Sequence, residues 1–205
     1  HINGVEGMRK AIRAAVRRGV KFLTVYAFST ENWGRPKEGV QALTESLCKS
    51  LSNETAELKS QGVRKRFIGD VEALAEDVRA AIARSEKETH RNEKLTLVVA
   101  VNYSSRWEIT RMAQKIAVQV RDEGLQIHEI TDRTVADNLV TAGIPDPDLL
   151  IRTSGELRLS NYLLWQLAYT ELYVTDCLWP DFDEKELEKA IFQYNKRDRR
   201  FGGVK

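Results

Sequence analysis

Segments with apolar residues at helical spacing alternate along the chain with short, continuous apolar runs. The helical spacing predicts helices over residues 4–18, 40–58, 74–89, 109–122 and 133–141, with a last helix after Asp183. The runs predict strands at 22–28, 63–68, 95–101 and 149–151. Because strand and helix alternate throughout, we predict an α/β fold, a single-domain parallel β-sheet covered by helices on both faces.

The composition fits one domain spanning residues 1–205, with 42% hydrophobic residues for a core. Charged residues make up 30%, but the net charge is only +2, so the chain lacks the overall basic field that nucleic-acid binding requires. Cys48 and Cys177 lack metal-ligand spacing, and no apolar run reaches the length of a membrane span. We expect a cytoplasmic, reduced protein with no nucleic-acid partner. The chain contains no GxGxxG or Walker motif for a nucleotide.

A polar and basic segment follows the strand predicted at 149–151, at a carboxyl end, where open α/β sheets bind ligands. Two guanidinium groups with hydroxyls and a glycine between them suit a diphosphate, because arginine pairs with phosphate oxygens and glycine lets backbone N–H groups approach. The alternative is two surface arginines in ion pairs with Glu156 and other carboxylates. The residues of this segment are Arg152, Thr153, Ser154, Gly155, Glu156, Arg158 and Ser160.

An apolar segment, 162–169, follows this loop, and Glu171 then stands in an apolar context. A carboxylate there requires a partner, because burying an unpaired charge is costly. The partner is either a divalent metal or an arginine, and the residues alone leave both open.

Three blocks of the chain carry a resemblance to a known family. They are IRTSGELRLSNYLLWQLAYTELY from Ile151, followed by WPDF; YAFSTENWGRP from Tyr26; and RRFGG from Arg199. In this combination and order, the chain resembles the cis-prenyltransferases, the family that includes bacterial undecaprenyl diphosphate synthase. The resemblance spans residues 1–203.

The resemblance implies a reaction and its partners. Family members extend an allylic diphosphate by isopentenyl diphosphate units, and each new double bond has Z geometry. We therefore expect an Mg²⁺-dependent prenyltransferase that condenses isopentenyl diphosphate with farnesyl diphosphate to a long-chain product such as undecaprenyl diphosphate. The resemblance further implies an undecaprenyl diphosphate synthase-like fold with an apolar tunnel, a homodimer, and peripheral membrane contact for product release.

The resemblance also assigns roles to residues of both loops. Asn32 matches the position proposed to relay a proton. A carboxamide is a poor base and would pass the proton on to a diphosphate oxygen; the alternative for Asn32 is a turn residue that bonds its own backbone. Glu171 matches an Mg²⁺ carboxylate. The matches to substrate-binding positions are His1, Ser29, Thr30, Glu31, Trp33, Arg35, Arg152, Arg158, Leu159 and Ser160.

Matches at the chain ends and in the tunnel have competing explanations. Arg200 and Gly202 match an Arg-x-Gly that reaches a diphosphate across the dimer, but a basic cluster at a helix C-terminus would look the same. His1 equally fits a frayed end. The tunnel positions implied by the resemblance are Ala27, Leu43, Leu47 and Leu95, although core residues would show the same apolar pattern.

One family feature does not occur in the chain. The catalytic aspartate of the family lies in an Asp-Gly-Asn-Gly-Arg-Trp loop ahead of the residue matched by His1, and that segment is absent from the sequence. We expect its first strand, phosphate-cradling glycines, metal carboxylate and allylic-site arginine to be missing with it, and the chain as given to be inactive. Leu157 stands where some members carry His, which we expect to be tolerated.

Two other functions compete with the enzyme. A non-catalytic partner subunit of a heteromeric complex also lacks the aspartate loop, but such a subunit has no need of Asn32, Arg152, Arg158, Ser160 and Glu171. An RNA-binding α/β module would require a clustered basic face, which the balanced charge does not offer.

Overall fold

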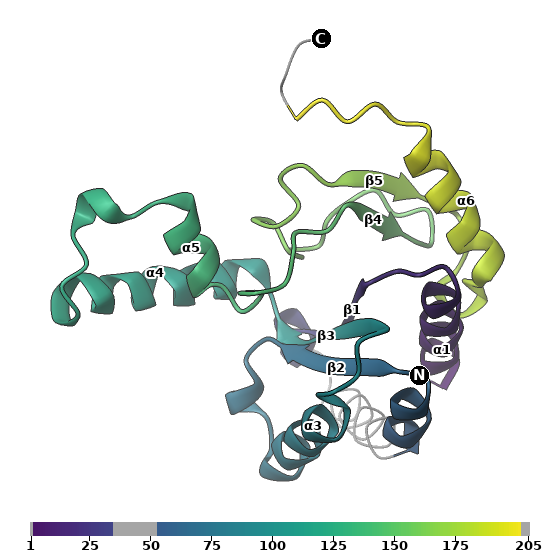
Figure 1. The fold of residues 1–205 in the computed structure, drawn as a ribbon, viewed down its shortest axis with the longest axis horizontal. Coiled ribbons are helices and arrows are strands. Elements are labelled where there is room, and N and C mark those ends of the chain that lie inside the picture. The colour runs from purple at the N-terminus through teal and green to yellow at the C-terminus, as the bar shows by residue number, and fades with distance from the viewer. Residues whose placement is uncertain (1, 35–52, 202–205) are drawn as a thin grey trace.

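The structure, a computed structural model, describes residues 2–34 and 53–201 (Figure 1). Residues 53–60 are helical. The other elements are α1 (Ile2–Arg17), β1 (Phe22–Ser29), η1 (Thr30–Gly34), β2 (Val63–Ile68), η2 (Val71–Ala73), α3 (Glu76–Thr89), β3 (Leu95–Tyr103), α4 (Ser105–Asp122), η3 (Ile127–Glu129), α5 (Asp132–Asn138), β4 (Leu149–Arg152), β5 (Glu171–Val174), η4 (Trp179–Asp181) and α6 (Glu184–Asn195).

β3 is the central strand of the larger sheet. It pairs in parallel with β1 on one side and with β2 on the other. Because side chains alternate between the faces of a strand, the odd-numbered residues from Leu95 to Val101 enter one apolar cluster, whereas Val98 and Ala100 enter another. None of these side chains is more than 5% exposed. β3 is therefore buried on both faces, as its uninterrupted apolar run predicts.

The strands are divided between two parallel sheets. β4 and β5 pair only with each other among the described strands, with Leu149 opposite Glu171 and Arg152 opposite Val174. The parallel α/β class is confirmed, but one continuous sheet is not what the described residues form. β5 was not among the predicted strands, because a segment of four residues is too short to show a strand pattern in the sequence.

The two sheets nevertheless share their apolar cores. Ile151 of β4 packs against the same cluster as Val25 of β1, and Leu150 packs against the same cluster as Tyr26. Each face of β4 thus continues a face of β1, although no hydrogen-bonded ladder joins the two strands within the described residues.

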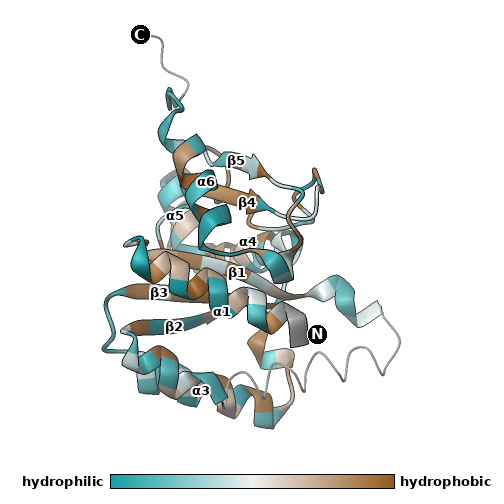
Figure 2. Ribbon diagram, turned by 90° about the vertical axis from the view of Figure 1, so that its right-hand side faces the viewer, coloured by the Kyte–Doolittle hydropathy of each residue, from teal (hydrophilic) through white to brown (hydrophobic). Residues whose placement is uncertain are grey.

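Helices cover both faces of the strands (Figure 2). α1, α3 and α6 pack on one side, through Ile12, Val78 and Leu187. α4 and the segment 162–167 pack on the other, through Trp107 and neighbouring residues. Two helices begin with a side-chain cap: Ser104 accepts from the Trp107 N–H at the start of α4, and Asp183 accepts from the Glu186 N–H at the start of α6.

Candidate functional site

Two of the candidate loops follow the carboxyl ends of parallel strands. Ser29 at the end of β1 pairs with Tyr103 at the end of β3, and β4 ends at Arg152. Each of these ends continues into a polar segment. The ends of parallel strands are where open α/β sheets bind ligands.

The η1 loop is fixed by contacts of two of its predicted site residues. Ser29 donates its backbone N–H to Asn32 Oδ1 at 2.8 Å, and Trp33 donates its Nε1–H to Asn102 Oδ1 at 2.6 Å. The Trp33 ring also meets Phe28 edge-on, with centroids 5.3 Å apart. The turn interaction that competed with a proton-relay role for Asn32 is therefore present. Since its oxygen is engaged, the amide hydrogens of Asn32 are the atoms left to meet a substrate.

Asn102 joins the ends of three strands and was not predicted as a site residue. Besides accepting from Trp33, it donates Nδ2–H to the Asp70 carbonyl at 2.9 Å and accepts the Asp70 N–H on its own carbonyl at 3.0 Å. The chain passes so closely here that a Cβ on Gly69, whose φ is +123°, would lie 1.9 Å from the Val101 carbonyl oxygen. Only glycine fits at position 69.

The loop after β4 is anchored by backbone hydrogen bonds that occupy the N–H groups of Ser154 and Gly155. Ser154 donates its N–H to the Cys177 carbonyl and Gly155 donates its N–H to the Thr175 carbonyl, both at 2.9 Å. The expectation that backbone N–H groups at Gly155 approach a phosphate is therefore wrong for this arrangement, because the segment after β5 already uses them. The loop's anion-binding capacity lies in its side chains.

Arg152 and Arg158 differ in their present partners. Arg152 donates Nη2–H to Ser160 Oγ at 3.4 Å, so two predicted substrate-binding residues are in contact. Arg158 forms an ion pair with Glu156, and its side chain is 62% exposed. Exposed pairs of this kind contribute little to stability, so an incoming diphosphate can replace Glu156 at modest cost. Leu159, which follows Arg158, packs against the cluster around Tyr162 and so fixes the end of the loop.

Glu171 lies away from this loop. Glu171 is the first residue of β5 and pairs with Leu149, the first residue of β4. Arg152 is three residues further along β4, so it lies about 10 Å from the Glu171 end of the strand pair. The partner of Glu171 is an arginine: Arg197 Nη1 lies 2.7 Å from Glu171 Oε2. Of the two partners that the sequence left open, the structure shows the arginine.

The described residues do not form a magnesium site by themselves. Among them, no three His, Cys, Asp or Glu side chains gather closely enough to hold a metal ion. Mg²⁺ characteristically takes one or two carboxylates, water and substrate phosphates, but the carboxylate of Glu171 is already neutralised by Arg197. A metal here would need further ligands and the release of Arg197.

The two candidate loops meet at a surface cavity of about 340 Å³ lined by Glu31, Arg106, Asn161 and Leu164. Asn161 Nδ2 donates to Glu31 Oε1 at 2.8 Å, which links η1 to the segment after Arg158. This hydrogen bond holds the pKa of the Glu31 carboxyl below its ordinary value. Glu31 is therefore charged at neutral pH and faces the segment after Arg158.

A buried polar cluster supports that segment from below. Glu108 is 1% exposed and accepts from the Tyr103 hydroxyl, from the Gln166 amide and from the Val140 N–H. Burial is the largest cause that raises the pKa of the Tyr103 hydroxyl, so Tyr103 remains a donor and is no base. Burial likewise raises the pKa of the nearby Tyr26 hydroxyl to about 12.

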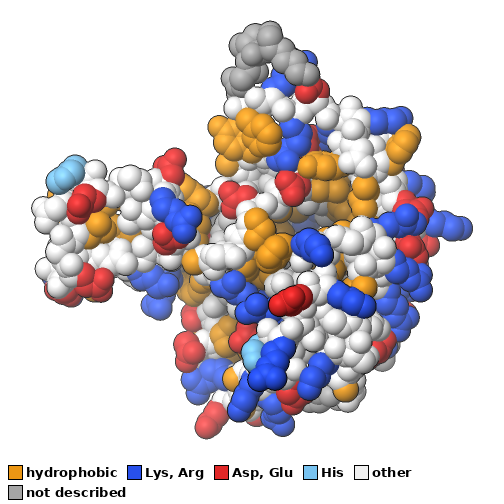
Figure 3. Space-filling model, viewed as in Figure 1, with side chains coloured by type: hydrophobic (Ala, Val, Ile, Leu, Met, Phe, Trp, Pro, Cys, Tyr) orange, Lys and Arg blue, Asp and Glu red, His pale blue; other side chains and the backbone are white. Residues whose placement is uncertain are grey.

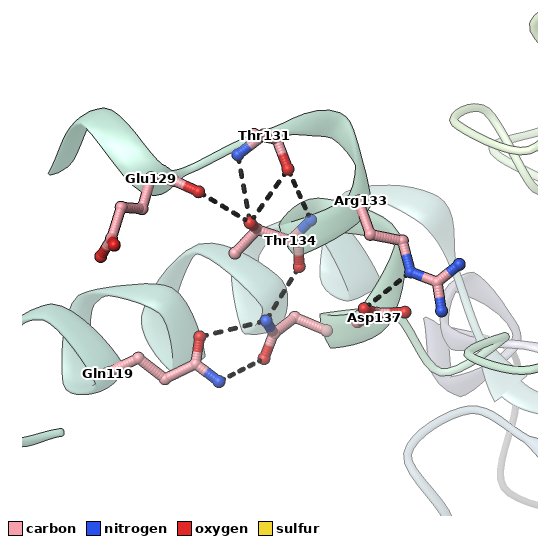
Figure 4. Close-up of polar contacts among 7 residues, drawn as sticks. Gln119, Glu129, Thr131, Arg133, Thr134 and Asp137 are labelled. Atoms are coloured by element: carbon pink, nitrogen blue, oxygen red, sulfur yellow. Dashed lines mark hydrogen bonds and ion pairs between the residues drawn. The ribbon is translucent and has the colours of Figure 1, made fainter. Parts of the chain in front are cut away.

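A second cavity, of about 510 Å³, lies on the arm formed by the outer part of α4, η3 and α5 (Figure 4). Its polar groups serve local structure: Thr131 and Thr134 form the capping box of α5, Gln119 and Asn138 exchange amide hydrogen bonds, and Arg133 pairs with Asp137 at 2.9 Å. The arm therefore carries no candidate chemistry.

Several predicted residues stay apart from the two loops or cannot be placed. Ala27 is exposed, Leu95 is fully buried in the core, and Arg200 donates to Asp198 at 3.4 Å. Their tunnel and cross-dimer roles stay predictions. The predicted residues outside the described ranges are His1, Arg35, Leu43, Leu47 and Gly202.

Comparisons with known proteins identify the family. The family model described as putative undecaprenyl diphosphate synthase matches residues 1–202. An isoprenyl transferase of Porphyromonas gingivalis is 50% identical over 98% of this chain and 80% of the relative. A protein of Haemophilus ducreyi named ditrans,polycis-undecaprenyl-diphosphate synthase ((2E,6E)-farnesyl-diphosphate specific) is 45% identical over 99% of this chain and 84% of the relative.

Solved structures agree with the sequence matches. Lavandulyl diphosphate synthase from Lavandula x intermedia, in complex with dimethylallyl diphosphate, superposes with a TM-score of 0.94 at 37% identity, over 98% of this chain and 86% of that one. A probable undecaprenyl diphosphate synthase from Campylobacter jejuni gives a TM-score of 0.87 at 32% identity, over 98% and 93%. The chain therefore belongs to the cis-prenyltransferases, the undecaprenyl diphosphate synthase family.

Proposed function

We propose that this protein is a prenyltransferase that condenses isopentenyl diphosphate with an allylic diphosphate, farnesyl diphosphate, in Z configuration to give a long-chain polyprenyl diphosphate such as undecaprenyl diphosphate. Family membership and the names of relatives at 44% to 50% identity support the reaction class. The observation that carries the proposal is the contact between the two signature loops, through Glu31 and Asn161, beside Arg152 and Ser160.

The anion-binding part of the reaction falls to the loop after β4. Arg152 and Ser160 already lie together, and the exposed guanidinium of Arg158 can turn from Glu156 to a phosphate oxygen. Two guanidinium groups and a hydroxyl would bind the diphosphate of isopentenyl diphosphate and hold its hydrocarbon end toward the allylic substrate. Asn32 orients a diphosphate oxygen through its amide hydrogens, and that oxygen takes up the proton that isopentenyl diphosphate loses in the condensation.

The apolar product requires a hydrophobic path. Figure 3 shows hydrophobic side chains gathered around a hollow between the β4–β5 sheet and the larger sheet. β1 and β4, whose side chains share both apolar clusters, border this region. We assign the start of the chain-elongation tunnel to it.

A further strand would close the gap between the sheets. Among the described residues, no hydrogen bonds pair β1 with β4. Side chains of both strands nevertheless pack into the same two apolar clusters, as happens when one further strand lies between two strands of a sheet. We assign this place to the family strand that leads into the Asp-Gly-Asn-Gly-Arg-Trp loop, which would put the aspartate beside η1 and Arg152.

Mg²⁺ is the expected cofactor, and Glu171 is the carboxylate of this chain that the family match would assign to it. Glu171 would join it only after releasing Arg197. Magnesium supplies charge neutralisation of the leaving diphosphate when it is bound.

A homodimer and transient membrane contact complete the proposal. Phe182 is 3% exposed and packs, together with Trp179, against the core beside α1, so these two rings are poorly placed for a dimer contact. Tyr169 and Phe201, whose rings lie 5.8 Å apart, are 64% and 59% exposed and are better candidates. None of the described helices is long and apolar enough to cross a bilayer. We place the enzyme in the cytoplasm, touching the membrane only to release product.

The test uses the full-length protein with Mg²⁺, farnesyl diphosphate and labelled isopentenyl diphosphate. Labelled polyprenyl diphosphates on a chromatogram support the proposal, and their lengths identify the product. No incorporation by the full-length protein alone, together with activity gained on adding a second, aspartate-containing family member, would instead establish the non-catalytic partner subunit.

A further inference from the structure

The segment after Arg158 has an unusual backbone. Ser160, Asn161 and Leu163 have φ values of +51°, +58° and +47°, in the left-handed region that non-glycine residues seldom adopt. Asparagine tolerates this region better than most residues, but the leucine and the serine do not. Three such residues within four positions persist only when surrounding contacts hold them.

Asn161 is where those contacts meet. The first turn of α4 binds it twice: Ser105 donates its N–H to the Asn161 carbonyl at 2.8 Å, and Arg106 donates its N–H to Asn161 Oδ1 at 3.0 Å. On its other side, Asn161 Nδ2 donates to Glu31 Oε1 at 2.8 Å, across 130 positions of sequence. One side chain thus joins α4, η1 and the loop after β4.

The contact with Glu31 continues a chain of polar groups that spans both loops. Arg152 contacts Ser160, Ser160 precedes Asn161, and Asn161 holds Glu31 in η1. The far end of the segment is fixed as well, because Leu164 donates its N–H to Ser105 Oγ at 2.8 Å. A shift of Asn161 would therefore move η1 and the Arg152–Ser160 contact relative to each other.

We propose that Asn161 is a positioning residue that sets the distance between the two substrate loops through its hydrogen bond to Glu31. This deepens the proposed function, since each loop would bind one diphosphate. Asn161 does not bind substrate in this proposal; it acts through Glu31 and through the left-handed turn that carries Ser160.

Asn161→Asp isolates the proposed contact. The substitution keeps the size of the side chain, the tolerance for a left-handed backbone and the acceptor for Arg106, but it places a second carboxylate opposite Glu31. In the full-length protein, we expect on the order of threefold to tenfold weaker binding of isopentenyl diphosphate and inorganic pyrophosphate by calorimetry. The KM for isopentenyl diphosphate should rise more than kcat falls, because ground-state positioning is lost.

The Glu31→Gln background supplies the matched comparison. There the glutamine amide can donate to the new carboxylate, so Asn161→Asp should weaken pyrophosphate binding by less than about twofold, or improve it. Equal weakening in both backgrounds would overturn the proposal. Asn195→Asp, an exposed change of the same charge at the end of α6, should leave both affinities unchanged. If it weakens binding as much as Asn161→Asp, general charge repulsion is the cause and the proposal is wrong.

Hydrogen exchange gives a readout that does not depend on turnover. Peptides covering 29–34 should exchange faster in Asn161→Asp and regain protection in the double variant. Unchanged exchange in these peptides contradicts the coupling. Absence of polyprenyl product from the wild-type protein would contradict the proposed function but not this result.

Discussion

Arg197 and Glu171 form an ion pair that joins the C-terminal tail to the first residue of β5, with 2.7 Å between Nη1 and Oε2. Their side chains are 36% and 26% exposed, so the pair is partly shielded from water. Arg199 supports the same tail through Asp148, at 2.8 Å, and through the carbonyl of Tyr169, at 3.2 Å. The tail thus holds the carboxylate that was expected to bind metal.

Releasing that pair should change the response to magnesium. If Glu171 binds Mg²⁺ in the working enzyme, Arg197 competes with the metal, and Arg197→Gln should lower the Mg²⁺ concentration for half-maximal activity by about twofold to fivefold. Glu171→Ala should reduce turnover and weaken the Mg²⁺ response. Arg133→Gln, which breaks a pair on the arm, is the control and should change neither. An unchanged Mg²⁺ titration in both Glu171→Ala and Arg197→Gln would remove Glu171 from the metal site.

Arg158 and Glu156 offer a paired test of the anion site. Arg158→Ala should raise the KM for isopentenyl diphosphate by about tenfold to a hundredfold, because a hydrogen bond between charged groups contributes about 1.5–3 kcal/mol. Glu156→Gln removes the present partner of Arg158 and should lower the same KM. Steady-state kinetics at saturating allylic substrate measure both. Opposite or absent shifts would place the anion site elsewhere.

Glu108 should be important for stability because it is a buried acceptor for several hydrogen bonds. Glu108→Ala removes the buried acceptor that the Tyr103 hydroxyl, the Gln166 amide and the Val140 N–H share, and should lower the free energy of unfolding by about 3 kcal/mol. Glu72→Ala, which breaks an exposed pair with Arg79, should change it by less than about 0.5 kcal/mol. Urea denaturation monitored by circular dichroism distinguishes the two, and equal losses would contradict the proposed anchoring.

The buried Lys65 should make the free energy of unfolding depend on pH. Its side chain is buried on β2 and donates to Thr55 Oγ1 at 2.9 Å, and burial lowers its pKa from 10.5 to about 8. Below pH 8 both folded and unfolded states are protonated. Between pH 8 and 10.5 the unfolded state binds more protons, so this group makes the protein more stable as the pH rises.

Lys65→Met removes that titration. At pH 7 the variant should be about 1 kcal/mol more stable than the wild type, since an apolar side chain of similar volume replaces a buried charge. The advantage should shrink between pH 8 and 10. Denaturation of both proteins at pH 7, 8, 9 and 10 measures the difference, and a difference that grows with pH would show that Lys65 is not charged and buried at neutral pH.

Much of the fold could be predicted because local patterns determined it. The strand predicted at 63–68 is β2, and the runs at 22–28 and 95–101 are β1 and β3 with small extensions. The long helices α1, α3, α4 and α6 were predicted from the helical spacing of their apolar residues. In these elements, burial pattern and local propensity agree.

The site could be predicted only in part. The loops after β1 and β4 were located correctly, because strand ends are visible in the sequence. The Glu31–Asn161 contact joins positions 130 apart, and a left-handed asparagine carries no periodic signal. The separation of Glu171 from Arg152 depends on the register of β4 and β5, and β5 was not predicted. Spacing along the chain does not encode such registers.

The free side of β1 has a consequence for handling this chain in solution. Its sequence, FLTVYAF, has no charge and no proline, is rich in β-branched and aromatic residues, and forms a ladder on one side only among the described strands. Such an edge is a template for pairing with other molecules. Residues 1–205 expressed alone should therefore self-associate into β-rich aggregates at high concentration, with β1 as the point of contact.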